Sequence, residues 1–338
     1  MTIKVGINGF GRIGRLALRA AWDWTEMEFV QINDPAGDAA THAHLLNFDS
    51  VHGRWQHEAG SEGDCVVIDG KRIKVSANKA IADTDWSSCD LVLEASGKMK
   101  TVAVLQGYLD QGVERVVVCA PVKEQGALNV VMGVNQHLFD PAQHRIVTAA
   151  SCTTNCLAPM AKVLDDTYGI KGGLMTTIHA YTNDQNTQDA PHPKGDLRRA
   201  RAAAQNIVPN STGAAKAIGL VLPNLKGKLD GSAQRVPTLT GSLTELTTIL
   251  GQKVTVEEVN KAMKAASNES YGYTEDEIVS SDIIGSHYGS IFDSTQTRVM
   301  SVGDIQLVKT VSWYDNEMSY VSQLVRTVKY FAGLINKK

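Results

Sequence analysis

Cysteine and long apolar runs are scarce in this sequence, and each shortage excludes a class of protein. The chain has five cysteines in 338 residues, which is a small and odd number for a disulfide framework. This favours reduced thiols. No run approaches the roughly 18 apolar residues that a membrane-spanning helix needs. The first residues carry no basic stretch followed by an apolar core, so we expect no secretory signal. We therefore expect a cytoplasmic protein without a membrane partner.

An excess of charge of one sign is also missing. The chain has 33 Lys and Arg residues against 36 Asp and Glu, a formal net charge of −3, and no tail concentrates either sign. This balance gives no reason to expect a nucleic acid as partner. The rest is typical of globular proteins, with 43% hydrophobic and 20% charged residues in a length that fits about two domains.

Short β-branched runs alternate with helix-like segments over the first 150 residues. The alternation predicts an α/β domain of the doubly wound, Rossmann type, with a parallel sheet whose faces are covered by helices. The expected strands are Ile3–Asn8, Phe29–Asn33, Leu91–Leu93, Val116–Val118, Val130–Met132 and Arg145–Val147, and the expected helices are Arg12–Asp23 and Thr101–Leu109.

The pattern changes after Ser151, where strands become longer and connections less regular. This predicts an α+β domain with a mixed sheet over residues 152–316, following a first domain over 1–151. A final segment, 317–338, has apolar residues at helical spacing and is expected to pack back on the first domain. The expected elements are a helix over Leu157–Thr167, strands over Gly173–Ile178, Leu243–Leu250 and Ile305–Trp313, and a helix over Glu317–Leu334.

A glycine-rich turn lies between the first expected strand and the first expected helix. It reads Gly9-Phe10-Gly11-Arg12-Ile13-Gly14, a pattern that lets backbone approach a pyrophosphate at a helix N-terminus. Asp34 ends the second strand 20 residues after Gly14, where a carboxylate binds both ribose hydroxyls of NAD and repels the 2′-phosphate of NADP. The pattern favours an NAD site, with a purely structural turn as the alternative.

Two cysteines stand at the start of an expected helix, in Ser151-Cys152-Thr153-Thr154-Asn155-Cys156. Amides at a helix N-terminus stabilise a thiolate, so we expect a lowered thiol pKa and a nucleophilic Cys152. No second group of Cys or His has ligand spacing, and we expect no metal. Two buried structural thiols, the commoner fate of cysteine, are the alternative, and these residues alone do not decide between the two.

Other segments of the chain show what kind of protein the Cys152 motif belongs to. Together they resemble the phosphorylating glyceraldehyde-3-phosphate dehydrogenases, in order, from about residue 3 to residue 330. Erythrose-4-phosphate dehydrogenases usually differ after the histidine, where this chain has Ala180-Tyr181-Thr182. The matching segments are Gly6–Arg15, Ala150–Pro159, His179–Asp184, Asp196–Arg201, Ser211–Lys216, Gly227–Gly231, Arg235–Thr238 and Ser312–Glu317.

The resemblance implies a reaction and its residues. Cys152 would attack glyceraldehyde 3-phosphate, with His179 as general base at a pKa suited to neutral pH; hydride would pass to NAD, and inorganic phosphate would release the thioester. The resemblance places Thr182, Arg199 and Arg235 at the substrate phosphate, and Ser151, Thr153, Thr212 and Gly213 at the attacking phosphate. It implies NAD contacts from Gly9, Gly11, Arg12, Ile13, Gly14, Asp34, Lys79, Gly97, Cys119 and Asn316.

Some positions depart from the family pattern. Lys79 stands where Arg is common, Cys119 replaces a usual Ser, and Asn210 replaces a small residue beside the phosphate site. Segments 33–38 and 52–55 resemble the form found with arsenic-resistance genes, so arsenate is an alternative attacking anion. A non-catalytic NAD-binding regulator is the alternative of another class. The family also implies a homotetramer, with segment 198–206 at an interface.

Overall fold

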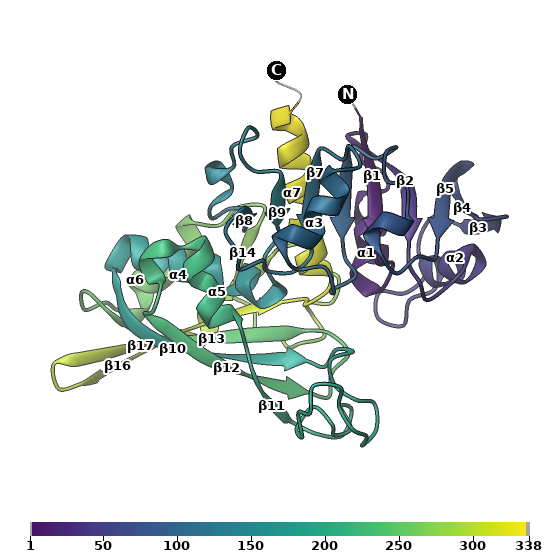
Figure 1. Ribbon diagram of the computed structural model, residues 1–338. Coiled ribbons are helices and arrows are strands. Elements are labelled where there is room, and N and C mark those ends of the chain that lie inside the picture. Colours follow the sequence, from purple (N-terminus) through teal and green to yellow (C-terminus); the bar gives the residue numbers. More distant parts are fainter. Residues whose placement is uncertain (1, 336–338) are drawn as a thin grey trace. The chain divides into compact units, whose positions relative to one another are not determined.

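The computed structural model describes residues 2–335, which divide into two compact units (Figure 1). Unit 1 comprises residues 2–130, 136–151 and 321–335, and unit 2 comprises residues 131–135 and 152–320. Each unit is built on its own sheet. No helix among residues 2–335 is long and apolar enough to cross a bilayer.

Unit 1 contains a nine-stranded sheet in the order β3-β4-β5-β2-β1-β6-β7-β9-β8. From β5 to β8 all neighbours are parallel, and the order runs outward from β1 in both directions, which confirms the doubly wound α/β class. The strands are β1 (Ile3–Asn8), β2 (Met27–Asn33), β3 (Ala59–Glu62), β4 (Cys65–Ile68), β5 (Lys71–Ser76), β6 (Leu91–Glu94), β7 (Arg115–Val118), β8 (Ala127–Asn129) and β9 (Ile146–Thr148).

The helices of unit 1 are α1 (Arg12–Ala21), α2 (Ala39–Asn47), α3 (Val102–Leu109) and the part of α7 (Met318–Ile335) from residue 321 onward. Helix α3 covers a core that includes Trp86, Tyr108 and Val116. Late in α7, Phe331 stacks on Phe139 with ring centroids 4.0 Å apart. The part of α7 from residue 321 onward therefore packs on unit 1, and residues 336–338 of the expected C-terminal segment lie outside the described residues.

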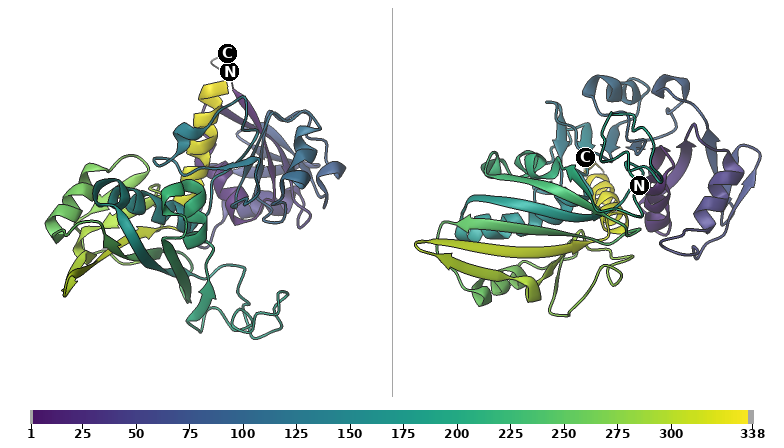
Figure 2. Two further views of the ribbon diagram at one scale, coloured as in Figure 1. Left: turned by 60° about the vertical axis from the view of Figure 1, so that its left-hand side comes forward. Right: turned by 90° about the horizontal axis from the view of Figure 1, so that it is seen from below.

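Unit 2 contains an eight-stranded mixed sheet in the order β11-β12-β10-β13-β17-β15-β14, with β16 paired to β17 (Figure 2, right). This confirms the expected α+β domain. The strands are β10 (Ile170–Ala180), β11 (Val208–Ser211), β12 (Leu229–Val236), β13 (Ser242–Leu250), β14 (Tyr271–Thr274), β15 (Ser290–Asp293), β16 (Arg298–Val302) and β17 (Ile305–Tyr314). Helices α4 (Cys152–Tyr168), α5 (Ala214–Val221) and α6 (Val256–Ala265) lie on one face (Figure 1).

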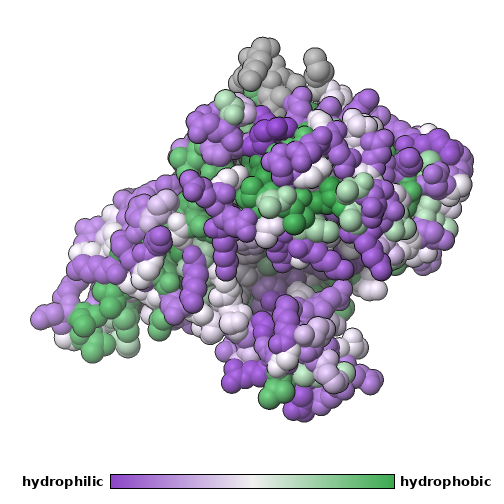
Figure 3. Space-filling view, in the orientation of Figure 1, coloured by the Kyte–Doolittle hydropathy of each residue, from purple (hydrophilic) through white to green (hydrophobic). Residues whose placement is uncertain are grey.

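The opposite face of this sheet is partly bare. Along β13, buried positions alternate with half-exposed ones, so one face packs against the helices and the other does not. The bare face holds a hollow of about 620 Å³ lined by Leu174, Ile249 and Leu307 among others. Met300, Val302 and Ile305 are also exposed, at the end of the β16–β17 hairpin where apolar residues gather at the lower left of Figure 3.

Two expected elements differ from the structure. Residues 130–132 are not a strand: β8 ends at Asn129, and the Asn135 side chain accepts from the Val131 amide, which closes a turn. The expected helix over Leu157–Thr167 begins earlier, at Cys152, and runs through Pro159. The early start matters, because it makes Cys152 the first residue of α4.

Candidate active site

The predicted cofactor residues of unit 1 follow the carboxyl ends of parallel strands. Gly9 follows β1, Asp34 follows β2, and Lys79, Gly97 and Cys119 follow β5, β6 and β7. These strands are neighbours in the sheet, so their carboxyl ends form one edge. In open α/β sheets a ligand binds at that edge, where the strand order reverses, which here is between β1 and β6. The structure thus brings these residues to the edge where a dinucleotide fits.

The glycines of the first turn have different structural roles. Gly9 has φ +92°, and a Cβ there would lie 2.4 Å from the Ser96 amide nitrogen. A Cβ on Gly14 would lie 2.2 Å from the Gly9 carbonyl oxygen. Gly11 differs, since nothing lies within 4 Å of its Cβ position. Gly9 and Gly14 are therefore required by the fold, whereas Gly11 leaves an open approach at the start of α1.

The carboxylate of Asp34 is held in place by two backbone amides. Its Oδ2 accepts from the Phe10 amide at 2.7 Å, and its Oδ1 accepts from the Ala36 amide at 2.8 Å. One of these bonds ties the end of β2 to the glycine turn. A carboxylate fixed beside that turn is suited to bind the ribose hydroxyls of a dinucleotide.

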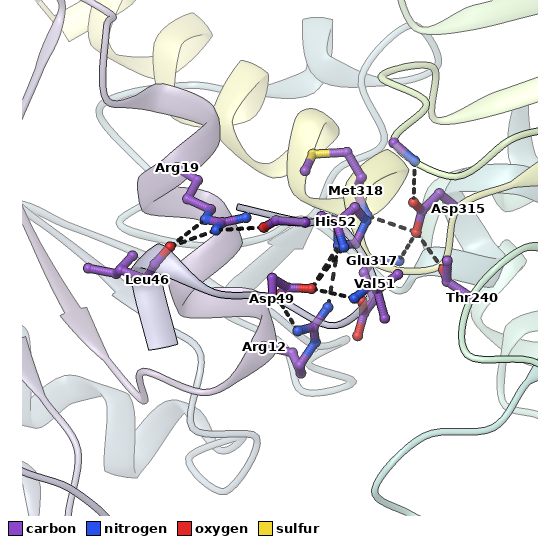
Figure 4. Close-up of polar contacts among 12 residues, drawn as sticks. Arg12, Arg19, Leu46, Asp49, Val51, His52, Thr240, Asp315, Glu317 and Met318 are labelled. Atoms are coloured by element: carbon purple, nitrogen blue, oxygen red, sulfur yellow. Dashed lines mark hydrogen bonds and ion pairs between the residues drawn. The ribbon is translucent and has the colours of Figure 1, made fainter. Parts of the chain in front are cut away.

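The side chain of Arg12, at the start of α1, is bound by Asp49 and His52 (Figure 4). Asp49 also accepts from the amides of Val51 and His52, both at 2.9 Å. Burial acts to raise the Asp49 pKa, but the bonds from His52 and Arg12 outweigh it and lower that pKa well below its usual range. Asp49 is therefore ionised at neutral pH and orients the Arg12 guanidinium.

In unit 2 the two predicted catalytic side chains lie in contact. The Sγ atom of Cys152 is 3.4 Å from Nε2 of His179. Cys152 is partly exposed, whereas His179 on β10 is buried. The His179 Nδ1 atom is 2.6 Å from the Ala180 carbonyl oxygen. Because a carbonyl oxygen only accepts, this contact assigns the ring proton to Nδ1 and leaves the Nε2 lone pair facing the thiol.

The pKa values of this pair differ from the sequence expectation. Burial raises the pKa of the Cys152 thiol, and the opposing effects of Arg235, Thr153 and the backbone do not overcome it. Burial, followed by the Arg235 charge, lowers the pKa of His179 to about 3. The expectations of a lowered thiol pKa and a near-neutral histidine are therefore wrong. Both groups are neutral at pH 7, so the thiol needs His179 as a base.

Arg235, on β12, lies beside the catalytic histidine. β12 is parallel to β10, and Arg235 is in register with His179. Its Nη1 atom donates to the Ala180 carbonyl oxygen at 3.2 Å. The same atom lies 2.9 Å from His179 Nδ1, but a guanidinium only donates, so with the ring proton on Nδ1 this is a contact between two donors and not a hydrogen bond. The Arg235 Nε–H is buried and has no hydrogen-bond partner within the described chain. A half-buried guanidinium with an unused, buried Nε–H next to a nucleophile is suited to bind an anion.

Sequence reasoning missed Tyr314, which packs against the catalytic residues. Its hydroxyl is 2.7 Å from the Thr177 hydroxyl and 3.0 Å from the Thr153 hydroxyl, and its ring meets the His179 ring edge to face. Tyr314 therefore links the first turn of α4 to β10. Tyr314 lies within Ser312–Glu317, one of the segments that resemble the family, and that was the available signal. The sequence does not show that its side chain is buried against the catalytic residues.

Asn316 is a buried amide in unit 2. Its Oδ1 atom lies 2.9 Å from the Ser242 hydroxyl and 3.1 Å from the Thr240 hydroxyl. The next residue back, Asp315, accepts from Thr240 and from the amides of Glu317 and Met318 at the start of α7 (Figure 4). Ser242 and Thr240 were not singled out as site residues from the sequence.

The predicted phosphate residues fall into two groups. Thr212 and Gly213 directly precede α5, and Ser151 and Thr153 flank Cys152 at the start of α4; both helix N-termini present amides to an anion. Thr182 follows β10 closely, two residues after its end. Arg199 is different, because its guanidinium is paired with both Asp184 and Asp196. A phosphate at Arg199 would have to compete with two carboxylates.

Among the described residues, no group of three or more His, Cys, Asp or Glu side chains could hold a metal ion. The five cysteines are all present as free thiols. The chemistry that the unit-2 side chains support is therefore nucleophilic, with a thiol, a neighbouring base and a half-buried cation.

Comparison with known proteins agrees with this chemistry. A family model described as the NAD binding domain of glyceraldehyde 3-phosphate dehydrogenase matches residues 3–102, and one for the C-terminal domain of that enzyme matches residues 151–316. The glyceraldehyde-3-phosphate dehydrogenase of Clostridium pasteurianum is 56% identical over 98% of this chain and 99% of its own length. That of Streptococcus pyogenes is 55% identical over 99% of each chain.

The chain belongs to the glyceraldehyde-3-phosphate dehydrogenase family. It is a dehydrogenase with NAD as cofactor. The matched NAD binding domain covers the glycine turn and Asp34, and the matched C-terminal domain covers Cys152, His179, Arg235 and Asn316.

Proposed function

We propose that this dehydrogenase oxidises D-glyceraldehyde 3-phosphate with NAD and inorganic phosphate, through a thioester on Cys152, to 1,3-bisphosphoglycerate. The observation that carries the proposal is the 3.4 Å contact between the Cys152 Sγ and the His179 Nε2 in a chain of this family. A non-catalytic NAD-binding protein would have no use for a thiol and a base in contact.

The first step is addition of the thiol to the aldehyde. Sγ bonds to the aldehyde carbon, and the thiol proton passes through Nε2 of His179 to the former carbonyl oxygen, which gives a hemithioacetal. The Nδ1 proton stays on the ring and remains hydrogen-bonded to the Ala180 carbonyl oxygen, so the ring keeps its orientation throughout. Arg235 favours the transient thiolate, because its charge lowers the pKa of Cys152.

The second step is oxidation. The hemithioacetal hydroxyl gives its proton to Nε2 of His179, and the electron pair of the C–H bond leaves as hydride. When bound, NAD accepts that hydride, and a thioester remains on Sγ. We propose that Gly9, Gly11, Gly14 and Asp34 hold the cofactor's pyrophosphate and ribose, and that the Asn316 amide holds the nicotinamide carboxamide. The open Gly11 position and the fixed Asp34 carboxylate fit such a ligand.

The third step is release by an anion. A phosphate oxygen attacks the thioester carbon, the C–S bond breaks, and the sulfur regains its proton from His179. We propose that Ser151, Thr153, Thr212 and Gly213 bind this phosphate, and that Arg235 and Thr182, with Arg199, bind the phosphate of the substrate. The unused Nε–H of Arg235 supports its part in this assignment. Arsenate has the same shape and charge as phosphate, and the rate test below includes it.

We also propose that the protein works as a homotetramer in the cytoplasm, where Cys152 stays reduced. The bare face of the unit-2 sheet supports self-association, since Leu174 is 67% exposed beside the hollow on that face. Sedimentation tests the assembly: a tetramer is expected, and Leu174→Glu should shift it to a smaller species. Leu138→Glu changes an exposed apolar side chain of unit 1 and serves as the control. A monomeric unaltered protein would refute the assembly.

The test of the reaction is NADH formation from glyceraldehyde 3-phosphate and NAD, with phosphate, with arsenate or with neither. Turnover that requires an anion supports the thioester route. Turnover with arsenate in strong preference to phosphate would assign the chain to arsenate metabolism. Sustained turnover with no anion would refute anion release of a thioester.

A further inference from the structure

Ser242, the first residue of β13, joins the catalytic strand to Asn316. Its Oγ atom accepts from the Ala180 amide at 3.0 Å and donates to the Asn316 Oδ1 atom at 2.9 Å. Ser242 is 1% exposed and Asn316 is 6% exposed, so water does not compete for these bonds.

The chemistry of the partners fixes the direction of these bonds. A backbone N–H only donates, so the Ala180 amide occupies a lone pair of the Ser242 oxygen and leaves the Ser242 proton for Asn316. Thr240 also lies near Asn316 Oδ1, at 3.1 Å, but its hydroxyl is closer to the Asp315 carboxylate, at 2.7 Å. A hydroxyl has one proton, and the charged acceptor takes it. The Ser242 proton therefore determines which end of the Asn316 amide is the oxygen.

The same chain of contacts reaches the catalytic base. The Ala180 N–H donates to the Ser242 Oγ atom, and the Ala180 carbonyl oxygen accepts from the Nδ1–H of His179. Ser242 is therefore hydrogen-bonded both to Ala180, the residue that orients His179, and to Asn316. This buried serine therefore fixes the position of Ala180, next to the catalytic base, relative to Asn316, the proposed cofactor contact.

We propose that Ser242 is a positioning residue for hydride transfer, which sets the orientation of the Asn316 amide toward the nicotinamide carboxamide. This rests on the proposed role of Asn316. With its oxygen held by Ser242, Asn316 presents its NH2 group to the carboxamide oxygen, and the nicotinamide ring keeps one face toward the substrate carbon. Without the Ser242 proton, the amide loses its enforced orientation, and the ring is free to turn over.

The experiment compares Ser242→Ala with Ser242→Thr, which keeps the hydroxyl. The aldehyde carries deuterium at its reacting carbon, and NMR of the product determines which face of the nicotinamide received it. For Ser242→Ala we expect label on both faces and a KM for NAD raised by up to about tenfold, the effect of one lost buried hydrogen bond. Ser242→Thr should restore single-face transfer. A merely structural role would lower the amount of folded enzyme without mixing the faces.

Two further variants make the result decisive. Thr248→Val removes another buried hydroxyl from the same face of β13, one that bonds the Val308 carbonyl, and it should keep single-face transfer. Asn316→Ala tests the premise and should mix the faces at least as much as Ser242→Ala. If Asn316→Ala leaves NAD kinetics and facial transfer unchanged, the role of Asn316 fails. If Asn316→Ala mixes the faces and Ser242→Ala does not, the role of Ser242 is overturned.

Discussion

The Sγ atom of Cys152 lies 3.4 Å from Nε2 of His179, although the two residues are 27 positions apart. The contact joins the first residue of α4 to the second-to-last residue of β10. Burial raises the pKa of the Cys152 thiol and lowers that of His179, so the pair acts by transferring the thiol proton to Nε2 when the aldehyde is attacked.

Replacing the base should slow the reaction without removing the nucleophile. In His179→Gln we expect kcat to fall by about 10²–10⁴-fold, the usual worth of a positioned general base. NAD affinity should stay near that of the unaltered enzyme, since the proposed NAD contacts do not include His179. Stopped-flow rates of NADH formation and titration of NAD binding check this. An unchanged kcat would show that His179 is not the base.

Removing the charge of Arg235 should shift the pKa values of both catalytic groups upward. The cation favours the thiolate and disfavours the imidazolium, so Arg235 lowers the pKa of Cys152 and of His179. In Arg235→Gln less thiolate is present at a given pH. Alkylation of Cys152 by iodoacetamide should therefore be slower at pH 8, with its pH profile moved to higher pH. Arg198→Gln, which removes an exposed cation of the same unit, should leave the profile unmoved. A shift to lower pH in Arg235→Gln would contradict the assignment.

The glycine turn allows stability and cofactor binding to be separated. Gly14→Ala places a Cβ 2.2 Å from the Gly9 carbonyl oxygen and should destabilise the protein by about 1–3 kcal/mol. Gly11→Ala meets no atom within 4 Å and should change the free energy of unfolding by less than about 0.5 kcal/mol. It should nevertheless weaken NAD binding, because its methyl group occupies the proposed approach of the pyrophosphate. Denaturant unfolding and NAD titration measure the two effects, and normal NAD affinity in Gly11→Ala would place the pyrophosphate elsewhere.

Loss of the Tyr314 hydroxyl should act on both stability and rate. Tyr314→Phe leaves the hydroxyls of Thr153 and Thr177 without their shared partner, at a cost of about 1–3 kcal/mol in free energy of unfolding. A lower kcat should accompany it, because the hydroxyl links the first turn of α4 to the strand of His179. Tyr273→Phe provides a control on a half-buried tyrosine of β14. Equal stability of Tyr314→Phe and the unaltered protein would argue against the linking role.

Much of this arrangement follows from local sequence patterns. The glycine turn and Asp34 directly follow two short apolar runs that are typical of buried strands, so the cofactor edge of unit 1 could be predicted. Cys152 and His179 were identified through motifs that resemble a family. Their contact in space depends on how α4 packs against the sheet that contains β10, which no local pattern gives.

The electrostatics of the site could not be predicted in the same way. The helix that begins at Cys152 affects the thiol pKa less than burial does, and burial is a property of the folded chain. The ion pairs of Arg199 with Asp184 and Asp196 could not be predicted either, because the sequence shows only a run of basic residues there. Ser242 was missed because one serine at the start of a strand carries no signal until its two partners are known.

The most direct measurement of the central claim is the deacylation of Cys152. Enzyme mixed with glyceraldehyde 3-phosphate and NAD, without any anion, should give a burst of NADH limited to one equivalent per active site and then stop. Mass spectrometry should find the acyl group on Cys152, and adding phosphate should release it and restart turnover, whereas Cys152→Ser should give no burst. Sustained turnover without an anion, or a burst in Cys152→Ser, would contradict the account.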